Sequence, residues 1–209
     1  MEALRGGNGE VDAAVAALRE GIPVVLPTDT VYGLCANPHT EESVRRAYDL
    51  KGRDAQQPSA LLANDVDRLL ECLPELRSRV EPVLRTLLPG PLTLVVANPA
   101  QRFRLLTGER ADTIGVRVPD LPAPADEVLS QVGLVMATSA NLPGGPDPAR
   151  LEDVPDEILE GCGAAIDAGE LPGVSSTVID LTADEPKVVR EGAVPARKVL
   201  DRLAGLAAE

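Results

Sequence analysis

The chain has 209 residues, a formal net charge of −13 and three widely separated cysteines, so it suits one soluble domain that folds without disulfides in a reducing cytoplasm. The odd cysteine count argues against a disulfide framework or a zinc knuckle, and no apolar run approaches the roughly 20 residues of a membrane span. The excess of acidic residues opposes passive binding to nucleic acid, which depends on releasing counterions from many lysine and arginine contacts.

The first quarter of the chain predicts a helix, a buried strand and a second helix. Apolar residues over 11–18 are spaced for one helix face, and Gly21 can close that helix in a left-handed conformation. Residues 22–26 form a short β-branched run that is typical of a buried strand. Thr40 is expected to cap the second helix, whose C-terminus reaches Lys51.

Short strands and helices follow over the rest of the chain. Strands are expected over 59–63, 92–97, 113–118, 134–137, 177–181 and 188–190, and helices over 65–72, 75–88, 124–131, 157–160 and 195–206. Pro82 is expected to kink or break the helix over 75–88. No internal repeat and no linker divides the chain, so residues 1–209 are expected to form one domain.

A polar motif with the sequence PTDTVYGL occupies residues 27–34, directly after the first expected strand. A buried strand that ends in proline and hydroxyl residues delivers its polar groups to one edge of the sheet, where ligands of open α/β sheets bind. The same octapeptide is equally typical of a turn with Tyr32 as core filler. Its function therefore depends on what else the chain supplies.

Lys51 and Arg53 flank Gly52 at the end of the second expected helix. Glycine permits a turned backbone and a close approach of a ligand to the chain. An arginine fork and a compact lysine charge together suit a triphosphate. Alternatively, the two cations simply favour the negative end of the helix dipole.

Polar residues also lie at the ends of other expected strands or within them. Ser139 and Asn141 could bind a phosphate, a ribose or a carbonyl from one extended segment, although a Ser or Asx turn is the simpler explanation of the pair alone. Arg117 lies in an apolar strand, where a buried guanidinium needs a carboxylate or a ligand as partner. Residues 175–177 and 190–192 repeat the pattern of polar groups at strand ends.

Together these motifs resemble the YrdC-like family of threonylcarbamoyl-AMP synthases over about residues 21–193. The matching segments are 27–34, 51–53, 89–93, 115–119, 138–141, 176–178 and 190–192. The resemblance implies a single α/β domain with a twisted mixed β-sheet and flanking helices around a concave active-site cavity. It also implies synthesis of threonylcarbamoyl-AMP and pyrophosphate from L-threonine, bicarbonate and ATP, for tRNA threonylcarbamoyladenosine modification. The chain resembles the short form of the family, without the extra C-terminal domain of longer relatives.

The resemblance assigns roles to individual residues. Lys51, Arg53, Ser139 and Asn141 match the functional quartet of the family. The implied ATP contacts are Arg53, Gln57, Thr113, Ser139, Asp147 and Arg190, and the implied threonine contacts are Thr30, Arg117, Ala137 and Ser176. Leu62 stands where some relatives have a histidine that helps to hold threonine, and Gln57 stands where they have asparagine. Amino-acid selection and the general base are therefore not identified by the resemblance.

The resemblance also implies partners. Magnesium is expected to enter with ATP, because the only histidine, His39, lies outside the motifs and no metal site is apparent. A tRNA threonylcarbamoyl-transferase complex is expected to use the product, while direct tRNA binding is expected to be weak because of the negative charge. Two alternatives stay open: an RNA-binding paralogue without synthase activity, and a carbamoyl-transfer enzyme like the related domain of hydrogenase-maturation proteins.

Overall fold

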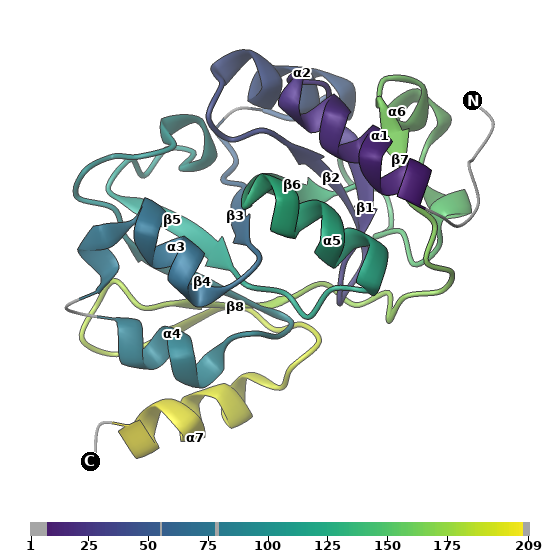
Figure 1. The fold of residues 1–209 in the computed structure, drawn as a ribbon. Helices are drawn as coiled ribbons and strands as arrows, with labels where there is room; N and C mark the ends of the chain where they lie inside the picture. The colour runs from purple at the N-terminus through teal and green to yellow at the C-terminus, as the bar shows by residue number, and fades with distance from the viewer. Residues whose placement is uncertain (1–7, 55, 78–79, 207–209) are drawn as a thin grey trace.

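In the computed structural model, which describes residues 8–54, 56–77 and 80–206, a nine-stranded mixed sheet forms the centre of the fold (Figure 1). The strands are β1 (Val24–Pro27), β2 (Tyr32–Ala36), β3 (Ala60–Ala63), β4 (Leu92–Ala97), β5 (Thr113–Arg117), β6 (Leu134–Ser139), β7 (Ala164–Ala165), β8 (Thr177–Asp180) and β9 (Lys187–Arg190). The helices are α1 (Asn8–Arg19), α2 (Glu41–Lys51), α3 (Val66–Cys72), α4 (Glu81–Leu87), α5 (Ala123–Val132), α6 (Asp156–Glu160) and α7 (Ala196–Leu206). The expected α/β fold is confirmed.

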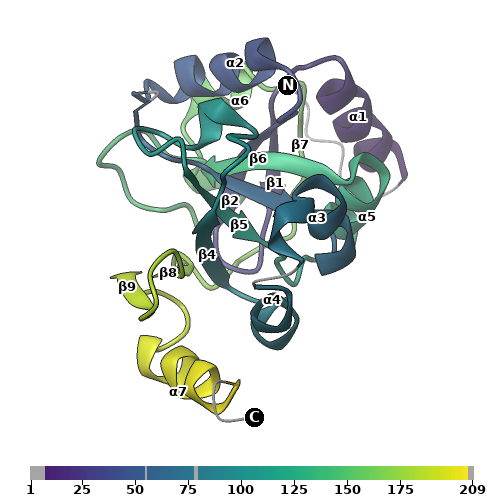
Figure 2. The same ribbon diagram turned by 90° about the vertical axis from the view of Figure 1, so that its left-hand side faces the viewer.

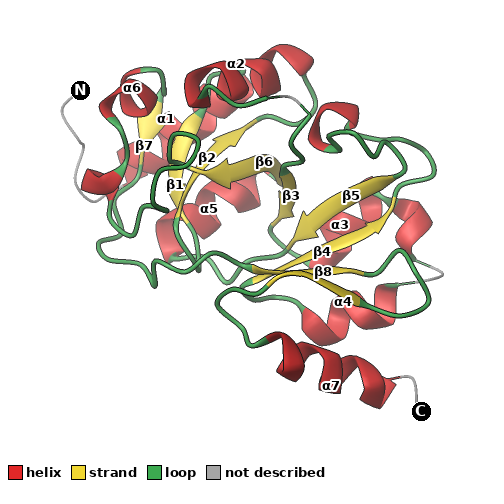
Figure 3. Cartoon of the chain, turned by 180° about the vertical axis from the view of Figure 1, so that it is seen from behind, coloured by secondary structure: helices red, strands yellow, loops and turns green. Residues whose placement is uncertain are grey.

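The strand order is β7-β1-β2-β6-β3-β5-β4-β8-β9, so strands that are distant in the sequence become neighbours. The pairs β1–β7, β3–β5 and β4–β8 are parallel, and the other neighbouring pairs are antiparallel. Figure 3 shows the strands as one twisted surface that runs from β1 to β8. This order brings the turn after β1, the end of β6 and the end of β5 into one region of the molecule.

Two hydrophobic clusters cover opposite faces of the sheet, because successive side chains of a strand point to opposite faces. In β6, Met136 belongs to the cluster that packs against α2, α3 and α4, whereas Val135 and Ala137 belong to the cluster that packs against α1 and α5. Helix α7 packs on α4 at the end of the molecule opposite to α1 (Figure 2). None of the helices in the described ranges is long and apolar enough to cross a membrane.

Most expected elements are confirmed, with a few local differences. Gly21, after α1, has the expected left-handed conformation with φ of 75°. Helix α2 ends at Gly52, which turns the backbone with φ of 61°, but the Thr40 side chain makes no capping hydrogen bond. Strand β2 was not expected, because its five buried residues fall within and after the turn-like PTDTVYGL motif. Strand β6 continues two residues further than expected, to Ser139.

The predicted break of the helix over 75–88 is confirmed, because α4 begins only at Glu81, next to Pro82. Proline lies in the first turn of α4, where the missing N–H would have had no helical partner, so it begins the helix and does not kink it. The preceding part of the expected helix contains a 3₁₀ turn at Pro74–Leu76, and residues 78–79 lie outside the described residues.

Candidate functional site

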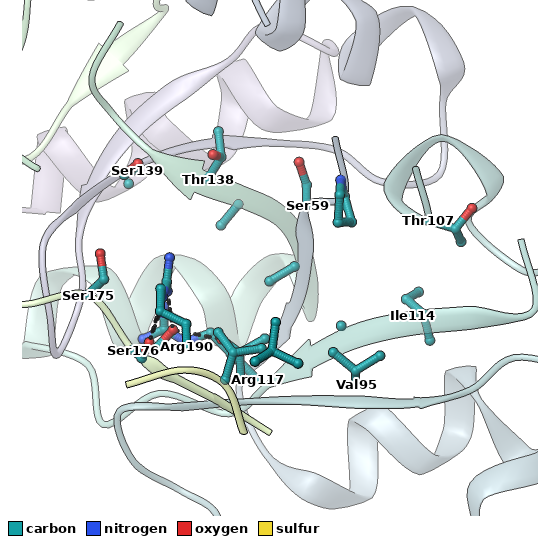
Figure 4. A pocket seen from close by; sticks show the side chains of 18 of the residues that line it. Ser59, Val95, Thr107, Ile114, Arg117, Thr138, Ser139, Ser175, Ser176 and Arg190 are labelled. Carbon is teal, nitrogen blue, oxygen red and sulfur yellow. Dashed lines mark hydrogen bonds between the residues drawn. The ribbon is translucent and has the colours of Figure 1, made fainter. Parts of the chain in front are cut away.

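A cavity of about 540 Å³ lies over the sheet beside α5, between the turn after β1 and the β8–β9 hairpin (Figure 4). Eight of the expected contact residues line it: Thr30, Arg53, Thr113, Arg117, Ala137, Ser139, Ser176 and Arg190. Four expected residues are not part of the lining: Lys51, Gln57, Asn141 and Asp147. The strand order therefore assembles most of the predicted site from segments that are far apart in the chain.

Arg117 forms a buried ion pair at one end of this cavity. Its Nη2 donates to Asp29 Oδ1 at 2.6 Å, and the two side chains are only 10% and 8% exposed. The same Nη2 also donates to Thr30 Oγ1 at 3.3 Å. Burial lowers the pKa of Arg117 and raises the pKa of Asp29, and the attraction between the two charges opposes both shifts. The carboxylate partner that a buried arginine requires is thus supplied by the PTDTVYGL motif.

Arg190 lies beside Arg117 on the same wall, as Figure 4 shows. Its Nε and Nη2 donate to the carbonyl oxygen of Ser176 at 3.1 and 2.9 Å. The hydroxyl of Ser176 in turn shares a hydrogen bond of 2.8 Å with Thr93 Oγ1. Two guanidinium groups face one carboxylate at this end, so the local charge favours an anionic ligand.

Glycine at position 192 permits the close packing that places Arg190. A Cβ atom there would lie 2.2 Å from the carbonyl oxygen of Ser175, a distance that no side chain tolerates. The amide of Gly192 instead donates to Thr177 Oγ1 at 3.0 Å. The segment 190–192 therefore lies directly against the start of β8.

Arg53 forms a second cationic wall. Its Nη1 donates to Thr138 Oγ1, and its Nη2 donates to the carbonyl oxygen of Pro58 at 2.5 Å. The guanidinium carbon lies 5.9 Å from the ring centroid of Tyr48, which is within cation–π range. Burial lowers the pKa of Arg53, and its Nε is buried without a partner in the described part of the chain.

Lys51 is engaged with the protein, although it was expected to face a triphosphate. Its Nζ donates to the carbonyl oxygens of Ser139 and Asn141 at 2.6 Å each and to Asn141 Oδ1 at 2.7 Å. Ser139 Oγ donates to the same Asn141 Oδ1 at 2.6 Å. Burial, and then the charge of Arg53, lower the pKa of Lys51 to about 8. Three of the quartet residues thus form one network, in which Lys51 clamps the loop after β6 from behind the cavity wall.

The PTDTVYGL motif serves both purposes that the sequence left open. It forms a tight turn in which Thr28 Oγ1 shares a hydrogen bond of 2.8 Å with Thr30 Oγ1 and donates to the carbonyl oxygen of Val31 at 2.7 Å. Tyr32 is fully buried core filler, and its hydroxyl donates to the carbonyl oxygen of Gly169 at 2.8 Å. At the same time Thr28 and Thr30 line the cavity.

The remaining expected residues, Asn141, Asp147 and Gln57, do not line the cavity. Asn141 Nδ2 donates to the carbonyl oxygen of Gly145 at 2.7 Å, and Asp147 accepts a hydrogen bond from Ser175 Oγ at the rim. Gln57 is exposed. Within the described residues, no group of three or more His, Cys, Asp or Glu side chains is arranged to hold a metal ion.

Sequence reasoning missed several residues that hold the cavity side chains in place. Thr138 and Thr93 line the cavity and bond to Arg53 and Ser176, and Asp29 lies behind the lining and bonds to Arg117. Asp29 and Thr138 lie within motifs that were recognised, so the signal was present, but the partners of these side chains are not readable from spacing.

Residues 16–192 match the Sua5/YciO/YrdC family, whose description is "Telomere recombination". The chain belongs to this family. It is 34% identical over 191 residues to a threonylcarbamoyl-AMP synthase of Pyrococcus abyssi, a match that covers 91% of this chain and 56% of the relative. The chain thus spans just over half the length of that relative.

Two solved structures of the Sua5/YciO/YrdC family are similar to this fold. P. abyssi Sua5 complexed with L-threonine has a TM-score of 0.86 and 33% identity, covering 95% of this chain and 58% of that one. E. coli YciO has a TM-score of 0.78 and 29% identity, covering 91% of this chain and 92% of that one.

Leu62, the departure from some Sua5/YciO/YrdC relatives, is part of the apolar core. It is 2% exposed, pairs with Arg117 across β3 and β5, and packs in the cluster that faces α1 and α5. This position therefore offers no hydrogen bond to a ligand. Polar contacts at this end of the cavity come from the hydroxyls of Thr28, Thr30 and Ser176 and from the two arginines.

Proposed function

We propose that this chain is an L-threonylcarbamoyladenylate synthase, a nucleotidyltransferase that makes threonylcarbamoyl-AMP and pyrophosphate from L-threonine, bicarbonate and ATP. The observation that carries the proposal is that one cavity holds the pair Arg117 and Arg190 together with a second wall of Arg53 and Ser139. The name of the P. abyssi relative and the L-threonine bound to P. abyssi Sua5 support the same activity.

The reaction requires little covalent participation by the protein. The deprotonated amine of threonine attacks the carbon of bicarbonate, water leaves, and a carbamate forms. A carbamate oxygen then attacks the α-phosphorus of ATP, and the bond to pyrophosphate breaks. Steps of this kind are accelerated mainly by positioning and by neutralising negative charge, which are the contributions that arginines lining the cavity can make.

We assign the charged groups by their positions in the cavity. Arg117 binds the carboxylate of threonine, while Arg190 and Arg53 neutralise phosphate charge. Lys51 acts through Ser139 and Asn141, because its ammonium is bonded to that loop. Magnesium enters as part of the ATP complex, which agrees with its preference for phosphate oxygens and water over a cage of protein ligands.

The test is pyrophosphate release by the purified chain with ATP, with bicarbonate and L-threonine supplied together or singly. Release is expected only when both are present. ATP turnover that is indifferent to bicarbonate would rule out the carbamate route. Turnover of carbamoyl phosphate in place of bicarbonate and ATP would favour the carbamoyl-transfer alternative.

The cellular context is proposed on the same basis. We propose that the chain is a single domain of the family, a reading that the one sheet running through the described residues supports. Free thiols at Cys35, Cys72 and Cys162 suit a reducing cytoplasm. The product passes to a tRNA threonylcarbamoyl-transferase complex, and the chain itself binds tRNA weakly because of its charge of −13.

A further inference from the structure

We propose that Asp29 is a positioning residue for the amino-acid substrate: its carboxylate holds Arg117 so that the remaining guanidinium donors face the carboxylate of threonine. This role rests on the proposed function. It concerns a residue that no motif assignment includes, and it follows from the hydrogen bonds and burial at one end of the cavity.

The Asp29 carboxylate is held by two segments of the chain. Oδ1 accepts from Arg117 Nη2 at 2.6 Å, and Oδ2 accepts from the backbone amide of Asp120 at 3.2 Å. Asp29 itself lies in the turn after β1, and Asp120 follows β5. Because both oxygens are engaged by different segments, the carboxylate has one orientation, and the guanidinium that it binds inherits that orientation.

Arg117 keeps donors that the described residues do not use. Its hydrogen bonds to Asp29 and Thr30 both come from Nη2, while Nε is buried and has no partner among the described residues. The residue as a whole is 8% exposed and lines the cavity. A buried donor without an acceptor is costly, so the ion pair with Asp29 is not shaped for the fold alone. Nη1 has no hydrogen bond among the described residues either, and this is the nitrogen that a ligand carboxylate in the cavity can reach, because Nε is closed off from it.

Asp29 also sets the local charge. Arg117 and Arg190 lie side by side on one wall and repel each other (Figure 4). The negative charge of Asp29 offsets this repulsion and stabilises the charged form of Arg117. Asparagine in place of Asp29 would keep an oxygen for Arg117 Nη2 but remove the charge, so the guanidinium would be held less firmly while the fold is preserved.

The experiment measures L-threonine binding by calorimetry, which requires no turnover, together with KM and kcat for pyrophosphate release. Asp29→Asn is expected to weaken L-threonine binding and raise its KM by about tenfold, as loss of a charge-assisted hydrogen bond does, while kcat and the KM for ATP change by less than about threefold. The matched control is Asp67→Asn on α3, which removes the same charge from an ion pair with Arg85 at 2.5 Å, and neither of these two residues lines the cavity. This control is expected to leave L-threonine binding unchanged.

A second variant protects the test against misfolding. Asp29→Glu keeps the charge but moves the carboxylate by one methylene, and it is also expected to weaken L-threonine binding. The proposal is overturned if a folded Asp29 variant binds L-threonine as the unaltered chain does, or if the unaltered chain does not bind L-threonine. If the chain releases no pyrophosphate but its L-threonine binding weakens in the Asp29 variants, the positioning role of Asp29 is supported and the synthase assignment is refuted.

Discussion

Replacing Lys51 with methionine tests whether this lysine clamps the loop after β6 or contacts a phosphate. Methionine keeps most of the side-chain length but removes an ammonium that donates to three oxygens within 2.7 Å. Hydrogen bonds to charged groups contribute about 1.5–3 kcal/mol each, so the three bonds set an upper limit of roughly 4.5–9 kcal/mol. Asn141 is half-buried and can bond to water after the substitution, which reduces the expected loss of stability to on the order of 3 kcal/mol.

This loss should appear in both stability and turnover. For a chain of this size, about 3 kcal/mol corresponds to a fall in Tm of roughly 6–12 °C. Turnover is expected to fall by at least about 10²-fold, because Ser139 is no longer fixed at the cavity wall. The KM for ATP is expected to change by less than about threefold, since Lys51 does not line the cavity.

The assay combines thermal unfolding with steady-state pyrophosphate release. Lys198→Met serves as the matched control, because Lys198 is exposed on α7, far from the loop after β6, and should change neither quantity. A tenfold rise in the KM for ATP with an unchanged Tm would refute the clamp and restore a direct phosphate contact for Lys51.

Four further outcomes are expected. Arg53→Ala should lower turnover by at least about 10²-fold, on the order of 3 kcal/mol, and a near-normal rate would reduce Arg53 to a helix-end cation. The chain has only three lysines, so NMR of labelled lysine should show one side chain that titrates near pH 8, and this signal should be absent in Lys51→Met. If no lysine titrates there, the three oxygens around Lys51 stabilise its charged form more than burial destabilises it. The pKa of a lysine in the unfolded chain is about 10.5, so unfolding takes up a proton at Lys51 between pH 8 and pH 10.5. The free energy of unfolding should therefore rise with pH between these two pH values. Direct tRNA binding should be weak at physiological salt and its affinity should fall steeply as salt rises, whereas adenylate synthesis should not need tRNA. Submicromolar tRNA binding that is unchanged by ATP and threonine, in a chain that forms no adenylate, would favour the RNA-binding alternative.

Local pattern alone located most of the secondary structure. Short apolar runs predicted β1, β3, β4, β6 and β8, because a strand that is buried on both faces is visible as an uninterrupted apolar segment. Alternation of side chains predicted β5. Gly21 follows α1 in the left-handed conformation, as expected, because glycine adopts this conformation without strain. Polar residues at strand ends were also recognised, and eight of the contact residues that the motifs and the family resemblance implied meet in one cavity.

Features that depend on the direction of a side chain or on a distant partner were decided only by the tertiary structure. Lys51 was expected to face a ligand, yet three oxygens some 90 residues away in the chain turn it toward the loop after β6. Pro82 carries the same dihedral restriction in a helix interior and in a first turn, so its effect depends on where the helix begins.

The Asp29 and Arg117 pair shows the same limit most clearly. The sequence showed that a buried arginine in β5 needs an acceptor and that a carboxylate lies in the PTDTVYGL motif, because both facts are properties of single residues and their near neighbours. Their pairing across 88 positions requires the strand order that places β1, β2, β6, β3 and β5 side by side. That order is set by the packing of two hydrophobic clusters against opposite faces of the sheet, a balance of long-range contacts that no local spacing encodes.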